Sequence, residues 1–196
     1  MTPDRSVISN LLRVLTLACA CLALPSLADD YTDISQLLRA NKFPEAMTLV
    51  DSKLAAKPAD PQLRFLKGVV QRNQGKQAEA IATFTKLTQD YPELPEPYNN
   101  LAVLYAAQGQ YDKARATLEM AIRTNPSYAT AYENLGDVYA RLASQAYGKA
   151  LQLDNGNIAV PAKLTVLRDL FKPAQAASAP ASAKPAATAS GASPTK

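Results

Sequence analysis

A 34-residue period constrains the fold of this chain more than any single motif does. Prolines, alanines and glycines recur at that interval, in the series Pro58, Pro92 and Pro126; Ala46, Ala80 and Ala114; and Gly75 and Gly109. The segments Tyr98-x2-Leu101-Ala102-x2-Tyr105 and Tyr132-x2-Leu135-Gly136-x2-Tyr139 are offset by the same interval. A fixed period of this length predicts stacked helix pairs, in which each pair buries its apolar face only against its neighbours.

Residues 1–28 are typical of a cleaved secretory signal peptide. Arg5 and Arg13 precede an apolar run over residues 14–24, and small residues at positions 26 and 28 place the cleavage between Ala28 and Asp29. The run is shorter than the roughly 20 apolar residues that span a bilayer. An uncleaved membrane anchor is the alternative.

The cysteine and histidine content limits the chemistry of the chain. Its 2 cysteines, Cys19 and Cys21, both lie inside the predicted signal peptide, and it contains 0 His. After cleavage of the signal peptide the chain would contain neither Cys nor His. This excludes metal clusters with those ligands and nucleophiles activated as Ser-His or Cys-His pairs. We predict no catalytic residue, no metal site and no cofactor. The remaining enzymatic alternative is a carboxylate pair in a closed cleft, and no pattern in the sequence indicates one.

The chain is basic only at its two ends. Of its 21 basic residues, two lie in the predicted signal peptide and three in the tail; of its 17 acidic residues, one lies in the signal peptide. Residues 29–171 thus carry 16 positive and 16 negative side chains. Nucleic-acid binding requires Lys and Arg clustered on one face, so no nucleic-acid partner is predicted.

Residues 172–196 contain mainly Ala, Pro, Ser and Thr, with three lysines and no aromatic residue. This composition buries too little apolar surface to offset the entropy of ordering, which predicts a disordered tail. Alternating Pro and Ala keep such a tail extended. A role as a spacer and no role at all are both open.

Helix-start and helix-stop residues support one all-α array over residues 29–171. Asp60 before Pro61 is typical of a helix cap followed by a proline in the first turn. Gly75 and Gly109 suit the left-handed residue that closes a first helix. The prolines at positions 58, 92 and 126 then stop each second helix.

The period and pattern resemble the tetratricopeptide repeat, whose signature is aromatic-x2-Leu-Gly-x2-Tyr, then Ala-x3-Phe, then Pro. Residues 95–128 match it at Tyr98, Leu101, Ala102, Tyr105, Gly109, Tyr111, Ala114, Leu118, Ala121 and Pro126. The resemblance implies a right-handed solenoid of about three to four helix-pair units with a C-terminal capping helix. The units are expected near residues 29–58, 61–94, 95–128 and, in degenerate form, 129–156.

The fourth unit departs from the pattern, because its Gly-containing turn is missing and Ala143, Tyr147 and Ala150 arrive five residues early. Residues 141–145 contain no helix breaker, so we predict one helix over residues 129–153 rather than a turned pair. A capping helix is predicted over residues 161–171, with its leucines, Leu170 among them, covering the open end of the array.

The tyrosines of the first helices are predicted to pack between helices, at positions 98, 105, 132 and 139. The small Ala102 and Gly136 allow the partner helix to approach closely, and the large residues on either side fill the remaining space.

In peptide-binding members of the family, the first helices line a concave groove, and an Asn beside the leading aromatic residue contacts the peptide backbone. By resemblance that role falls on Asn100 and Asn134. The alternative is that Asn is simply the usual residue at this site of the repeat. The candidate groove residues are Phe65, Val69, Arg72, Asn99, Asn100, Val103, Glu133, Asn134, Asp137 and Arg141.

The predicted partner is an extended protein segment. It is apolar toward Phe65 and Val69, and neutral or basic toward Glu133 and Asp137, although a solvated acidic face is an equal reading of those two carboxylates. We predict a non-enzymatic protein-interaction scaffold in the periplasm of a Gram-negative bacterium, active in the cell envelope. The alternatives are a structural subunit of a larger envelope or secretion complex, bound through its outer faces, and a secreted or membrane-anchored protein.

Overall fold

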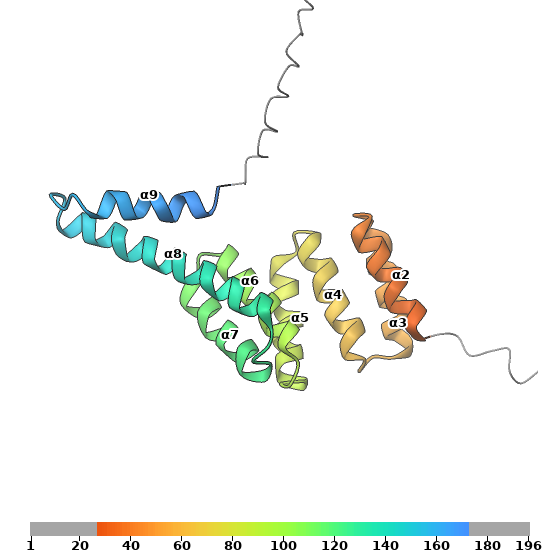
Figure 1. The fold of residues 1–196 in the computed structure, drawn as a ribbon. Helices are drawn as coiled ribbons and strands as arrows, with labels where there is room; N and C mark the ends of the chain where they lie inside the picture. The colour runs from red at the N-terminus through yellow and green to blue at the C-terminus, as the bar shows by residue number, and fades with distance from the viewer. Residues whose placement is uncertain (1–26, 173–196) are drawn as a thin grey trace, which may run out of the picture. The chain divides into compact units, whose positions relative to one another are not determined.

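A computed structural model describes residues 27–172, and every regular element of that range is an α-helix (Figure 1). The helices are α2 (Leu27–Arg39), α3 (Phe43–Ala56), α4 (Pro61–Asn73), α5 (Gln77–Asp90), α6 (Pro95–Ala107), α7 (Tyr111–Thr124), α8 (Ala129–Leu153) and α9 (Val160–Leu170). Most of the predicted signal peptide (residues 1–26) and nearly all of the predicted tail (residues 173–196) lie outside the described residues.

The chain divides into two compact units, and the division falls after Leu142, within α8. In the first unit α2 packs on α3, α4 on α5 and α6 on α7, and each pair packs on the next (Figure 1). The first part of α8 then packs on α6 and α7 through Ala131 and Val138. This is the all-helical repeat array that the 34-residue period predicts.

A residue with left-handed backbone ends the first helix of each pair. Gly75 has φ 75° and Gly109 has φ 72°, as predicted. Asn41, at φ 56°, occupies the same repeat position in the first pair, one period before Gly75. Asn is among the few non-Gly residues that adopt this conformation readily, which is why a search for glycine alone misses it. The next position of the series is Ala143, which is helical, and α8 continues through it.

The start of α4 is fixed by Asp60. Its Oδ1 accepts a hydrogen bond of 2.9 Å from the backbone N–H of Leu63, which is the predicted helix cap. Its Oδ2 accepts a second bond of 2.7 Å from the Tyr31 hydroxyl on α2. One carboxylate therefore caps a helix and ties the first pair to the second.

The core consists of three apolar clusters that follow one another along the array. The first joins Ile34, Ala46 and Val50 to the inner face of α4, and the second gathers around Phe84, Leu87 and Leu104. The third holds α6, α7 and the first part of α8 together, with Ala102, Ala114, Leu118 and Ala121 fully buried. Each cluster forms where one helix pair meets the next.

The packing predicted for α8 is wrong in three places. Tyr132 is 50% exposed and Tyr139 is 49% exposed, whereas Tyr98 at the matching site of α6 is only 8% exposed. No atom of the described residues outside the local helix lies within 4 Å of where a Cβ on Gly136 would stand. The reason is that α8 continues as one helix where the earlier repeats turn, and it packs on α6 and α7 through Ala131 and Val138 instead.

The second unit contains the end of α8 and α9. The Oδ1 atom of Asn157 accepts hydrogen bonds from the backbone N–H groups of Ala159 and Val160, which ties the loop before α9 to the start of that helix. Val160 is buried, but Leu170 is 64% exposed. The prediction that Leu170 covers apolar surface is therefore wrong, because the last turn of α9 faces solvent there. A capping role for α9 as a whole remains a prediction.

Gly68 tests how tightly α4 and α5 pack. A Cβ at this position would stand 2.7 Å from the ring of Phe84, which is fully buried and cannot move aside. We expect Gly68→Ala to lower the free energy of unfolding by about 1–2 kcal/mol, since overpacking outweighs the gain in helix propensity. Gly148→Ala, in an open position on α8, should leave the melting temperature unchanged or raise it. Thermal unfolding followed by circular dichroism measures both, and equal stabilities would contradict the packing.

Asp60 tests the link between the first two pairs. We expect Asp60→Ala to lower the free energy of unfolding by about 2 kcal/mol, because it removes a helix cap and the bond from Tyr31. Asp60→Asn keeps an oxygen acceptor for the cap and should lose less than half as much. Urea unfolding of the two variants provides the comparison; a difference below the error of the measurement would contradict the role of the carboxylate.

Candidate functional site

The predicted groove residues lie on three successive first helices of the first unit. Residues 65, 69 and 72 are on α4, residues 99, 100 and 103 are on α6, and residues 133, 134, 137 and 141 are on α8. Their exposure differs between the three helices, and the candidates on α4 are partly buried. Asn99 and Asn100 are buried, whereas Glu133, Asp137 and Arg141 are exposed. The carboxylates of Glu133 and Asp137 are thus accessible at one end of this face.

Two hydrogen bonds join neighbouring first helices along this face. The Nη1 atom of Arg72 on α4 donates to Oδ1 of Asn100 on α6 at 2.6 Å. The Nδ2 atom of Asn134 on α8 donates to Oδ1 of Asn99 on α6 at 2.7 Å. The structure therefore brings four of the predicted residues together in two pairs, and both pairs stabilise the stacking of units.

The Asn100 side chain uses its acceptor and its donor within the protein. Its Oδ1 accepts from Arg72, and its Nδ2 donates to the backbone carbonyl of Glu96 at 3.0 Å. Burial lowers the pKa of the Arg72 guanidinium. A bound peptide could hydrogen-bond to Asn100 only by replacing one of these partners. In this structure Asn100 instead links α6 to α4. Arg72 is partly exposed, and its guanidinium has N–H donors besides the one that binds Asn100.

A pocket of about 320 Å³ opens where α4 and α6 begin. Its lining consists of four apolar and two polar residues: Pro61, Gln62, Phe65, Leu94, Glu96 and Pro97. The Phe65 ring lies against that of buried Phe84, with ring centroids 5.7 Å apart, which holds it in place. The pocket has the size and the mostly apolar lining to receive an apolar side chain, and Glu96 is one of its lining residues.

Only Phe65 of this pocket was a candidate from the sequence. The repeat period contains a signal for the others, because Pro61 and Pro95 are one period apart, as are Gln62 and Glu96. The prolines start the first helices of two neighbouring units. Residues near the starts of α4 and α6 therefore line the same pocket between two neighbouring repeats.

Glu96 also acts on its surroundings toward α8. Burial raises the pKa of the Tyr128 phenol, and the negative charge of Glu96 adds to the rise. The negative charge of Glu96 therefore acts on Tyr128, in the loop that leads into α8. Together with Glu133 and Asp137 it makes this part of the face acidic.

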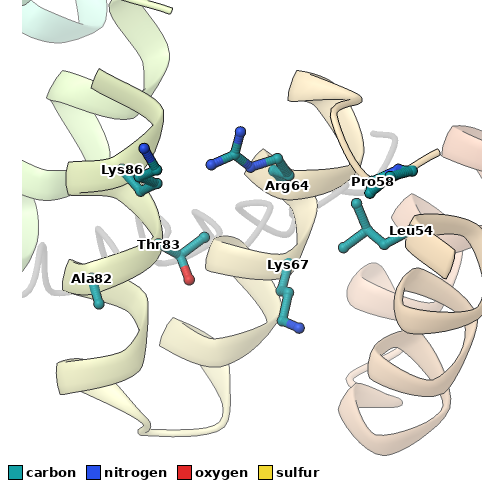
Figure 2. A pocket seen from close by; sticks show the side chains of 7 residues that line it. All are labelled: Leu54, Pro58, Arg64, Lys67, Ala82, Thr83 and Lys86. Atoms are coloured by element: carbon teal, nitrogen blue, oxygen red, sulfur yellow. The ribbon is translucent and has the colours of Figure 1, made fainter. Parts of the chain in front are cut away.

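A second hollow, of about 430 Å³, lies on the side of the second helices (Figure 2). It is lined by Leu54, Pro58, Arg64, Lys67, Ala82, Thr83 and Lys86. Figure 2 shows Arg64 reaching toward Lys86, and both bind Asp90, at 2.8 and 2.7 Å. Hydrogen bonds from Lys86 and then Arg64 lower the pKa of the Asp90 carboxyl.

The charges around this second hollow are largely compensated. Lys67 binds Asp51 at 2.8 Å, so the three cations face two carboxylates. These pairs are partly or fully exposed, and such pairs contribute little to stability. An anionic ligand would have to replace Asp51 or Asp90. The paired charges therefore disfavour a small anion in this hollow.

Residues 27–172 contain neither a cluster of metal-ligating side chains nor a membrane-spanning helix. Within that range there is no group of three or more His, Cys, Asp or Glu side chains placed to hold a metal ion. None of the helices α2–α9 is long and apolar enough to cross a membrane.

Related proteins of known sequence share the repeats over part of the chain. The chain is 35% identical over 88 residues to the tetratricopeptide repeat domain-containing protein PYG7, chloroplastic, of Arabidopsis thaliana, covering 42% of this chain and 29% of that protein. It is 28% identical over 102 residues to photosystem I assembly protein Ycf3 of Prochlorococcus marinus, covering 50% and 56%. The matches thus span less than two thirds of these relatives.

Solved structures with the same fold are more distant in sequence. A thermophilic TPR protein of Thermus thermophilus superposes with a TM-score of 0.57 at 23% identity, covering 74% of this chain and 82% of that one. The Sgt2 TPR domain of Aspergillus fumigatus gives a TM-score of 0.58 at 14% identity, covering 63% and 83%. At these identities the likeness shows the fold.

Three sequence profiles cover the first unit almost continuously. Two profiles described as tetratricopeptide repeat match residues 34–95 and 83–116, and one described as TPR repeat matches residues 104–142. The matched range contains the left-handed turns, the stacked helix pairs and the 34-residue period described above. Residues 34–142 of this chain are therefore tetratricopeptide repeats.

Proposed function

We propose that this protein is a non-enzymatic scaffold that binds an extended segment of another protein along its first helices. Tetratricopeptide repeats generally mediate protein–protein interaction, and repeat arrays offer extended concave surfaces for it. The observation that carries the proposal is the pocket between the starts of α4 and α6, where a fixed Phe65 ring and three apolar neighbours can receive an apolar side chain.

The charges beside the pocket define the chemistry of the bound segment. Exposed Glu96 is part of the lining, and Glu133 and Asp137 are exposed further along the same series of helices. A segment with one apolar anchor and a following Lys or Arg fits this order of groups. Arg72 supplies partly buried N–H donors for a backbone carbonyl of the segment.

The cell envelope is the proposed place of action, and the support is the signal-peptide pattern of residues 1–28. A second candidate function is a structural subunit of a larger envelope or secretion complex. The hollow beside Leu54, Arg64 and Lys86 supports it, because it is an accessible contact surface on the side of the second helices.

Site-specific photo-crosslinking in the expressing cells distinguishes the two candidates. A crosslinking side chain at exposed Gln62 reports on the pocket between α4 and α6, and one at exposed Ala82 reports on the second hollow. We expect a discrete protein adduct from position 62. An adduct from position 82 alone would overturn the groove proposal and favour the structural subunit.

Glu96 provides a quantitative test once the adduct has been identified. We expect Glu96→Lys to raise the Kd for that protein at least about tenfold, because it replaces an attraction by a repulsion at the pocket. Glu119→Lys is the matched control, since Glu119 is exposed on α7, a second helix. Titration calorimetry measures both. Equal Kd values for the two variants would remove Glu96 from the site.

A further inference from the structure

One side of α8 carries a stripe of six residues at helical spacing. They are Tyr132, Gly136, Tyr139, Ala143, Tyr147 and Ala150, and the steps between them are four, three, four, four and three residues. Steps of this kind keep side chains on one face of a helix along its whole length. Large and small residues alternate in the first part of the stripe and again in the second.

The first half of the stripe corresponds to the face of a first helix that the second helix of the same pair normally covers. On α6 the matching residues are Tyr98, which is 8% exposed, and Ala102, which is fully buried beneath α7. On α8 the tyrosines at 132 and 139 are half exposed, and the space beside Gly136 is open. The face that α7 covers on α6 is therefore present on α8 and available.

The second half of the stripe has the pattern of a second helix. Ala143-x3-Tyr147-x2-Ala150 repeats the spacing of Ala114-x3-Leu118-x2-Ala121 on α7, whose three residues are fully buried. The connection is different, because eight residues separate Tyr105 from Ala114 but only three separate Tyr139 from Ala143. Since α8 is one continuous helix, its second half does not turn back onto its own first half.

We propose that a second copy of this chain supplies the missing helix, so that two α8 helices pair antiparallel about a two-fold axis. On α6 and α7, antiparallel pairing about the turn near Gly109 sets Ala102 level with Leu118 and Tyr98 level with Ala121. The same repeat positions on α8 set Gly136 level with Tyr147 of the partner subunit, and Tyr132 level with Ala150 of the partner subunit.

The stripe is self-complementary in this arrangement. The third level sets Tyr139 against Ala143 of the partner subunit, so every tyrosine meets a glycine or an alanine. In each of these three residue pairs, the midpoint between the two residue numbers is 141 or just beyond it. One two-fold axis that passes near residue 141 therefore relates all three pairs. A two-fold axis repeats each level, and the pairing therefore has six large-to-small contacts.

The second unit leaves room for this pairing at Tyr147. The ammonium group of Lys163 on α9 lies 5.2 Å from the centre of the Tyr147 ring, and the ring is only partly buried. On α7 the matching Leu118 is fully buried between α6 and α8. One side of Tyr147 is thus taken by α9, and the other is the side that a first helix of the partner would cover.

Sedimentation equilibrium of the purified protein, expressed from the full sequence, tests the proposal. We expect the wild type to be a dimer and Gly136→Lys to be a monomer at the same concentrations, because the lysine would stand where the partner's Tyr147 packs. Gly148→Lys is the matched control: it also has open space on α8, but it faces away from the stripe and should stay dimeric. A wild type that is monomeric throughout, or two variants that behave alike, would overturn the proposal.

Cysteine crosslinking tests the register. In a background with Cys19→Ser and Cys21→Ser, a copy with Tyr132→Cys is mixed with a copy with Ala150→Cys and oxidised. Along one helix these positions are about 27 Å apart, so a disulfide requires two copies. We expect a disulfide-linked heterodimer in the mixture. A variant that carries both Tyr132→Cys and Ala150→Cys in one chain provides the control. A disulfide within that single chain would show that α8 folds back on itself, and this result would overturn the proposal that a second copy supplies the helix.

Discussion

The reversal of the chain after each first helix is the constraint on which the array depends. After each first helix the chain folds back through one residue with left-handed backbone, and Asn41, Gly75 and Gly109 hold this position at equal intervals. Each helix pair formed in this way packs on the next, and a buried apolar cluster forms where the two meet. Where the series reaches Ala143, the helix continues, and the apolar face of α8 is left without its second helix.

The repeat period predicts the array well because it records this constraint directly. Helix pairs, the Asp60 cap, the left-handed glycines and the continuity of α8 all follow from local residue types at fixed spacing. The burial of a tyrosine does not. Tyr98 and Tyr132 occupy the same repeat position, yet one is buried and the other is half exposed, since burial depends on whether another helix arrives.

The candidate site was less accessible to sequence reasoning for a related reason. The family pattern identifies Asn100 and Asn134 as groove residues, but it does not show that Arg72 and Asn99 use them as partners between units. These bonds depend on the distance between stacked helices. The pocket at Phe65 and Pro97 arises in the same way, from two proline-started helices that the stacking sets side by side.

The missing turn in α8 also bears on how such an array can change in length during evolution. Because each apolar cluster forms between neighbouring pairs, a duplicated pair inserted before α8 would meet the same surfaces on both sides. A pair added after α8 would meet no second helix on which to stack. With a helical residue at the position of the left-handed turn, this repeat is the last that can stack in the same way, and growth of the array is confined to its interior and its other end.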